Sequence, residues 1–176
     1  MDIKEGDIIA FEATTIQKAL LRLIEPYSDR WHFVLVGDPI DDDFEIYESL
    51  PSGIKINRLS YYRGRNAKVY RVEVDSIAHK AAEKASLYGR YGYDYVLFLW
   101  LFWTAIKYWL VYGFRKVPYW VFKNEDNKSL ICTELVKECF DSVGYPLFEK
   151  GIIPTPSAFQ QSVLERRLNK VYEGVI

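Results

Sequence analysis

Two cysteines are the residues of this chain best suited to covalent chemistry, and one of them stands where a helix should begin. Apolar residues at helical spacing predict a helix over 129–143 (SLICTELVKECFDSV), closed by Gly144. In this helix Cys132 falls in the first turn and points to the core side, as does Cys139. A helix N-terminus favours the thiolate form of a cysteine. Cys132 is therefore a candidate nucleophile; the alternative is that it only fills space in the core, as Cys139 is expected to do.

A nucleophilic thiol needs a base, and His32 is the candidate. The segments 31–37 (WHFVLVG) and 44–50 (FEIYESL) predict two strands, joined by a turn over 38–43. A hairpin centred on that turn pairs His32 directly with Glu48. A carboxylate beside a histidine fixes its tautomer and stabilises the imidazolium form. The alternative is a structural His–Glu ion pair at a strand end.

The same hairpin register places His32 and Glu48 on one face of the sheet, because side chains alternate along a strand. Further along, that face is apolar, with Val34 opposite Ile46 and Val36 opposite Phe44. A slip of one residue would change the partner of the histidine. If the Cys132 helix packs on this face, the thiol, the imidazole and the carboxylate meet.

The chemistry of such a site would be acyl transfer. His32 would take the Cys132 proton, the thiolate would attack an amide or ester carbonyl, and Glu48 would hold the imidazolium. The backbone N–H of Cys132, at the helix start, is a natural donor to the oxyanion.

The elements that must position these residues predict an α+β fold in a single domain over 1–176. Strands cluster early in the chain and helices late. Further strands are expected at 6–11, 53–59 and 67–74, and further helices at 14–27, from 75 or 76 to about 88, and near 157–168, after an extended loop at 153–159.

Composition excludes several classes of function. The 23 basic and 24 acidic residues nearly cancel and form no long block of one sign, so nothing indicates a nucleic-acid partner. With only 2 histidines and no C-x-x-C pair, we expect no metal site, and no cofactor is indicated. Seven residues along a helix separate the two thiols by about 10 Å, too far for a disulfide. The start MDIKEGDIIAF does not resemble a signal peptide, so a reducing, cytoplasmic setting is expected, with peripheral membrane attachment left open.

Segment 96–114 (VLFLWLFWTAIKYWLVYGF) is strongly apolar and its only charge is Lys107. Its length would suffice to span a bilayer. A single crossing there would leave His32 and Cys132 on opposite sides of the membrane, so the span and the triad exclude each other. Given the triad, the segment is a buried helix, a helical pair, a homo-oligomer contact or an element at a membrane surface.

In this order the motifs resemble the circularly permuted NlpC-type papain-like cysteine peptidases, in particular the YiiX-like branch. The matching pieces, from residue 6 to residue 159, are GDIIAF, WHFVLV, IYESLPSGIKI, GRYGYDY, ICTELVKECF and TPSAF. The resemblance implies a permuted papain-like fold in which a small antiparallel sheet packs against the cysteine helix, with 96–114 as an apolar helical insert. It also implies a Cys–His–Glu triad of Cys132, His32 and Glu48.

The match has departures. Threonine follows the cysteine where serine is expected, and the third triad group is Glu48 where unpermuted relatives more often use histidine or asparagine. The resemblance implies Tyr93 as an oxyanion or substrate-binding residue. It favours a cysteine peptidase or amidase, and leaves open a lipid acyltransferase or lipid-acyl hydrolase and a non-catalytic papain-like binding module.

Overall fold

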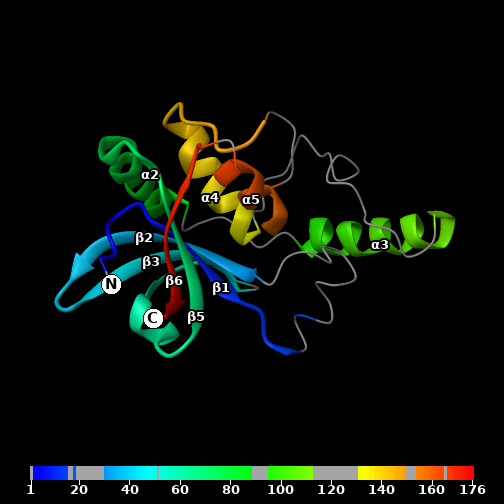
Figure 1. Cartoon of the computed structure of the whole chain (residues 1–176), viewed down its shortest axis with the longest axis horizontal. Coiled ribbons are helices and arrows are strands. Elements are labelled where there is room, and N and C mark those ends of the chain that lie inside the picture. The colour runs from blue at the N-terminus through cyan, green and yellow to red at the C-terminus, as the bar shows by residue number, and fades with distance from the viewer. Residues whose placement is uncertain are drawn as a thin grey trace.

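The structure is a computed structural model, and it describes residues 2–15, 18, 30–50, 52–88, 95–112, 131–149, 154–164 and 166–176. It is α+β, as the strand and helix patterns predict, with a six-stranded antiparallel sheet and helices on one side of it (Figure 1). The strands are β1 (Ile8–Glu12), β2 (Arg30–Ile40), β3 (Asp43–Leu50), β4 (Gly53–Arg58), β5 (Asn66–Arg71) and β6 (Asn169–Val175).

The sheet order is β4-β3-β2-β1-β5-β6, so β2 and β1 are central. Strand β6 was not predicted from the sequence. It is an edge strand, and exposed residues along it, including Val171 and Val175, weaken the apolar alternation that would have indicated it.

Both faces of the sheet are covered. The first, which we call the helix face, carries Phe33 and Leu35 of β2 and Ile8 and Ala10 of β1. The second, which we call the histidine face, carries Val34 and Val36 of β2, Ile9 and Phe11 of β1, and Ile46 of β3. The short 3-10 helix η1 (Leu59–Tyr62) folds back against the histidine face through Leu59 and Tyr62.

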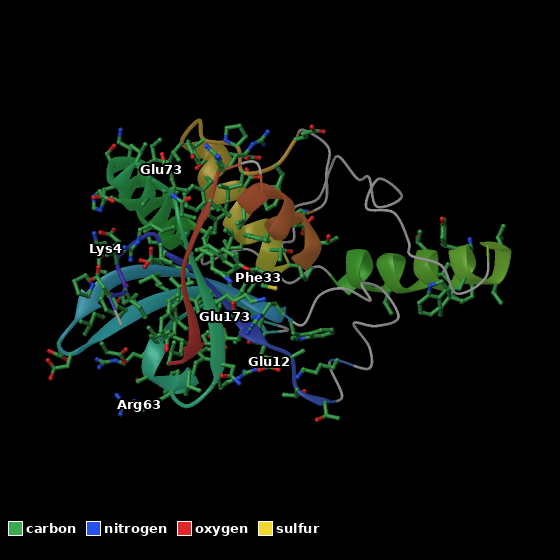
Figure 2. The ribbon with its side chains drawn as sticks, viewed as in Figure 1. Lys4, Glu12, Phe33, Arg63, Glu73 and Glu173 are labelled. Carbon is green, nitrogen blue, oxygen red and sulfur yellow. The ribbon has the colours of Figure 1, made fainter. Side chains whose placement is uncertain are left out.

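The helices α2 (Asp75–Leu87), α4 (Cys132–Ser142) and α5 (Pro156–Leu164) pack on the helix face. Phe33 of β2 stacks on Phe159 of α5 with ring centroids 4.4 Å apart, and Figure 2 shows Phe33 between the sheet and the helices. Of the helix predicted at 14–27, Thr15 and Lys18 are helical, whereas 16–17 and 19–29 lie outside the described residues.

The predicted register of the β2–β3 hairpin is wrong by two residues. Val34, not His32, lies opposite Glu48, and Val36 lies opposite Ile46. The turn is only Asp41–Asp42, with Asp41 at φ 54, and the pairing shifts between Val36 and Pro39. Two residues is a full period of a strand, so the face on which each side chain lies is unchanged.

Segment 96–114 is helical as far as Tyr112, within α3 (Tyr95–Tyr112), and 113–114 lie outside the described residues. Figure 1 shows α3 to one side of the sheet and its helices. The interpretation as a helix buried on all sides is wrong, because Leu99, Trp103, Leu110 and Val111 are exposed. Among the described residues, no helix combines the length and apolar character needed to cross a bilayer.

Candidate active site

Cys132 is the first residue of α4; it lies in the first turn as predicted, although the helix begins at 132 and not at the predicted 129. Ile131 before it is extended, and its N–H donates to the Glu134 carboxylate at 3.0 Å, which fixes the first turn. Cys132 itself is partly buried, and its Sγ lies 3.9 Å from the carbonyl oxygen of Trp31 on β2. The thiol is therefore held beside the start of β2, next to the residue that carries the imidazole.

Cys132 and His32 lie close together although α4 packs on one face of the sheet and the His32 side chain lies on the other. The α4 helix packs on Phe33 and Leu35, whereas the side chain of His32 alternates to the other face with Val34. The condition set out from the sequence, that the cysteine helix packs on the histidine face, is therefore not met. Cys132 still lies near His32, because the first residue of α4 reaches the start of β2 beside Trp31 and its thiol helps to raise the pKa of the imidazole.

The imidazole of His32 is also bonded to the Glu48 carboxylate. Its Nε2 lies 2.5 Å from Oε2 of Glu48. The two residues are diagonal neighbours across β2 and β3, within reach of long side chains. Burial opposes protonation of His32, but the hydrogen bonds and charges of Cys132 and Glu48 outweigh it and raise its pKa to about 9.

The Glu48 carboxylate is 1% exposed and accepts two further hydrogen bonds. The Asn57 side-chain amide donates to Oε1 at 2.5 Å, and the Tyr62 hydroxyl donates to Oε2 at 2.5 Å. Burial raises the pKa of Glu48, but the hydrogen bonds from His32, Asn57 and Tyr62 overcome it and leave that pKa below its ordinary value. The group is thus kept ionised beside the imidazole.

Sequence reasoning missed both Asn57 and Tyr62. Asn57 had a signal: it lies opposite Ile46 in β4, two residues beyond the partner of Glu48, and so on the histidine face. Tyr62 had none, because its position depends on how η1 folds back beneath the sheet. There its ring stacks on Phe11, with centroids 4.1 Å apart, and lies 5.8 Å from the ring of His32.

The second cysteine has no polar environment of this kind. Cys139 lies on the same helix two turns further on and is completely buried among apolar residues. Burial raises the pKa of its thiol far above the ordinary value, which keeps it protonated. This matches its predicted role as core filler.

Two further residues, Tyr93 and His79, and the acidic, histidine and cysteine side chains as a group complete the description of the site. Tyr93 lies outside the described residues. His79 of α2 is largely exposed and pairs with Glu5 at 2.8 Å, so nothing among the described residues connects it to the Cys132 site. Within the ranges that the structure describes, no group of histidine, cysteine and acidic side chains is placed to hold a metal ion.

Comparison with known proteins assigns no family to this chain. No protein-family model matches it, and no curated protein sequence is significantly similar to it.

Proposed function

We propose that this protein is a cysteine hydrolase that cleaves an amide bond, a peptidase or amidase with a Cys132–His32–Glu48 triad. The observation that carries the proposal is the position of His32. Its Nε2 lies 2.5 Å from Oε2 of Glu48, and the carbonyl oxygen of Trp31, the residue before it, lies 3.9 Å from Sγ of Cys132, close enough for the thiol to help raise the pKa of the imidazole. A thiol, a base and a group that orients the base are the parts that nucleophilic catalysis requires.

The reaction has two halves. His32 takes the Cys132 proton, the thiolate attacks the amide carbonyl, and the backbone N–H of Cys132 at the start of α4 donates to the oxyanion. The C–N bond then breaks, the leaving amine takes the proton from His32, and a thioester remains on Cys132. Water gives a proton to His32 and attacks the thioester, and breakage of the C–S bond returns the thiol and releases a carboxylic acid.

The order of these elements supports a permuted papain-like fold as part of the proposal. His32 and Glu48 lie on the sheet and precede the cysteine helix in the chain, and α4 packs on that sheet. A non-catalytic module with this shape is the less favoured interpretation, because a binding scaffold needs neither a thiol beside a histidine nor a buried carboxylate hydrogen-bonded to that histidine. A cytoplasmic setting suits the chemistry, since both cysteines are free.

The test is selective alkylation of native protein with iodoacetamide, read residue by residue by mass spectrometry. Cys132 should be alkylated at pH values well below about 8.5, the ordinary pKa of a thiol, and Cys139 should not. Cys139→Ser should leave the fast reaction intact, and Cys132→Ser should abolish it. Equal, slow alkylation of both thiols would remove the nucleophile from the proposal.

A second candidate, a lipid acyltransferase or lipid-acyl hydrolase on the same triad, is supported by α3. Its exposed apolar side chains, among them Leu99, Trp103 and Leu110, suit a membrane surface, where tryptophan and tyrosine are enriched. Co-sedimentation with liposomes tests this candidate. Binding that is lost when Leu99 and Leu110 are changed to Glu would favour lipid, and no binding would leave the amide hydrolase.

A further inference from the structure

The Glu48 carboxylate is held by more donors than a histidine partner alone requires. Its Oε1 accepts from Asn57 of β4, while its Oε2 accepts from Tyr62 of η1 and faces Nε2 of His32. Three different elements therefore converge on one buried carboxylate. A carboxylate that orients a histidine must itself be prevented from rotating, because rotation about its last torsion would turn Oε2 away from the imidazole.

Tyr62 is itself fixed. Its ring is stacked on Phe11 at an interplanar angle of 18°, and the guanidinium of Arg65 lies 5.5 Å from the ring centroid. Arg65 is held in turn by a hydrogen bond from Nη2 to the carbonyl oxygen of Glu12, 2.8 Å long. The backbone on either side of the turn is anchored by bonds from Ser60 N to the Asp43 carboxylate and from Gly64 N to the carbonyl of Ile176.

We propose that Tyr62 is a positioning residue of this site: its hydroxyl, carried by a ring that stacks on Phe11 and lies beside the ring of His32, holds Oε2 of Glu48 against the imidazole. Its contribution to catalysis rests on the proposed function, but the hydrogen bond itself can be tested without any substrate. Tyr62 acts through Glu48 and not on the reacting carbonyl, because its hydroxyl proton is directed to the carboxylate.

The neighbours of Glu48 determine the pH at which its carboxylate titrates. His32 approaches from β2, Asn57 from β4 and Tyr62 from η1. Lys55, directly opposite Glu48 on β4, is exposed to solvent. Of the donors, Tyr62 is the one whose hydroxyl can be removed while its ring is kept.

The experiment follows the side-chain carboxyl carbon of Glu48 by 13C NMR as a function of pH, in the wild type, in Tyr62→Phe and in Tyr61→Phe. Tyr61 is 73% exposed and next to Tyr62 in the chain, so it is the matched control. Loss of a hydrogen bond to a charged group should raise the titration midpoint of Glu48 by about one pH unit. Tyr61→Phe should leave it unchanged. A midpoint in Tyr62→Phe equal to that of the wild type overturns the proposal.

Alkylation of Cys132 supplies the functional half of the test. In Tyr62→Phe the pH below which Cys132 stops reacting with iodoacetamide should rise together with the titration midpoint of Glu48. The maximal alkylation rate at higher pH should be retained. A purely structural tyrosine would lower the reactivity at every pH instead, and that result would also count against positioning.

The two failures are distinguishable. If Cys132 is unreactive in the wild type but the Glu48 midpoint still moves in Tyr62→Phe, the proposed function fails and the hydrogen-bond assignment stands. If Tyr62→Phe is too unstable for the acid titration, Asn57→Ala removes the donor to Oε1 and should raise the midpoint of Glu48 in the same direction. An unchanged midpoint in Asn57→Ala would refute the premise that hydrogen-bond donors hold this carboxylate, and the role of Tyr62 with it.

Discussion

Glu48→Gln is the substitution whose effect can be worked out most directly from the structure. Glutamine keeps the shape of the side chain and removes the charge that faces Nε2 of His32. The pKa of His32 is about 9, which stands about 2.5 pH units above the ordinary value of 6.5. Burial alone would lower this pKa, and the interactions with Cys132 and Glu48 more than reverse that effect. Loss of the Glu48 charge should therefore lower the pKa of His32 by about one pH unit, roughly 1.4 kcal/mol.

The same substitution changes how stability depends on pH. Because the pKa of His32 is raised on folding, its contribution is fully present below about 6.5 and is lost as the pH rises through about 9. The wild type should therefore lose stability to urea over this window by about 3 kcal/mol at most, and Glu48→Gln should lose about 1 kcal/mol less.

The assay is 15N NMR titration of the imidazole rings, together with urea unfolding at several pH values. The chain has only 2 histidines, so the second, the exposed His79, is an internal control whose titration should not change between wild type and Glu48→Gln. A His32 pKa that stays near 9 in Glu48→Gln would refute the reasoning, since the carboxylate would then do nothing for the imidazolium.

Two further substitutions test the scaffold. Gly37→Ala should cost about 1–3 kcal/mol in urea unfolding, because a Cβ at Gly37 would lie 2.5 Å from the ring of Tyr47; a neutral effect would mean that this ring moves freely. Arg71→Met should cost about 3–5 kcal/mol, because Asp7 is 1% exposed and would lose the hydrogen bonds from Nε and Nη2 of Arg71 at 2.7 and 2.8 Å. Restoring most of that stability with Asp7→Asn in the Arg71→Met background is expected, and its absence would show that the buried charge is not the cause.

The side-chain contact between His32 and Glu48 could be predicted from the sequence, because it depends only on whether the two residues lie on the same face of the sheet. The two-residue turn at Asp41–Asp42 and the shift between Val36 and Pro39 moved the register, but by an even number. An even shift keeps both side chains on the same face, and their length bridges the diagonal.

The face on which α4 packs was not predictable. Both sets of alternating residues in β2 are apolar, with Phe33 and Leu35 on one face and Val34 and Val36 on the other. Hydrophobic pattern alone therefore cannot say which face receives the cysteine helix. The place of Tyr62 was out of reach for a similar reason, because a 3-10 turn carries no periodicity that would show where its side chains point.

The Cys132 thiol and the His32 imidazole belong to different layers of the molecule, and the chain makes them at different times. An emerging polypeptide carries the imidazole and the carboxylate of β2 and β3 long before Cys132 is synthesised. Once made, the sulfur reaches the vicinity of His32 only after α4 docks on the far side of the sheet. A nascent or partly unfolded copy would thus react as an ordinary free thiol, and under the proposed function alkylation of Cys132 at low pH would report that α4 has docked.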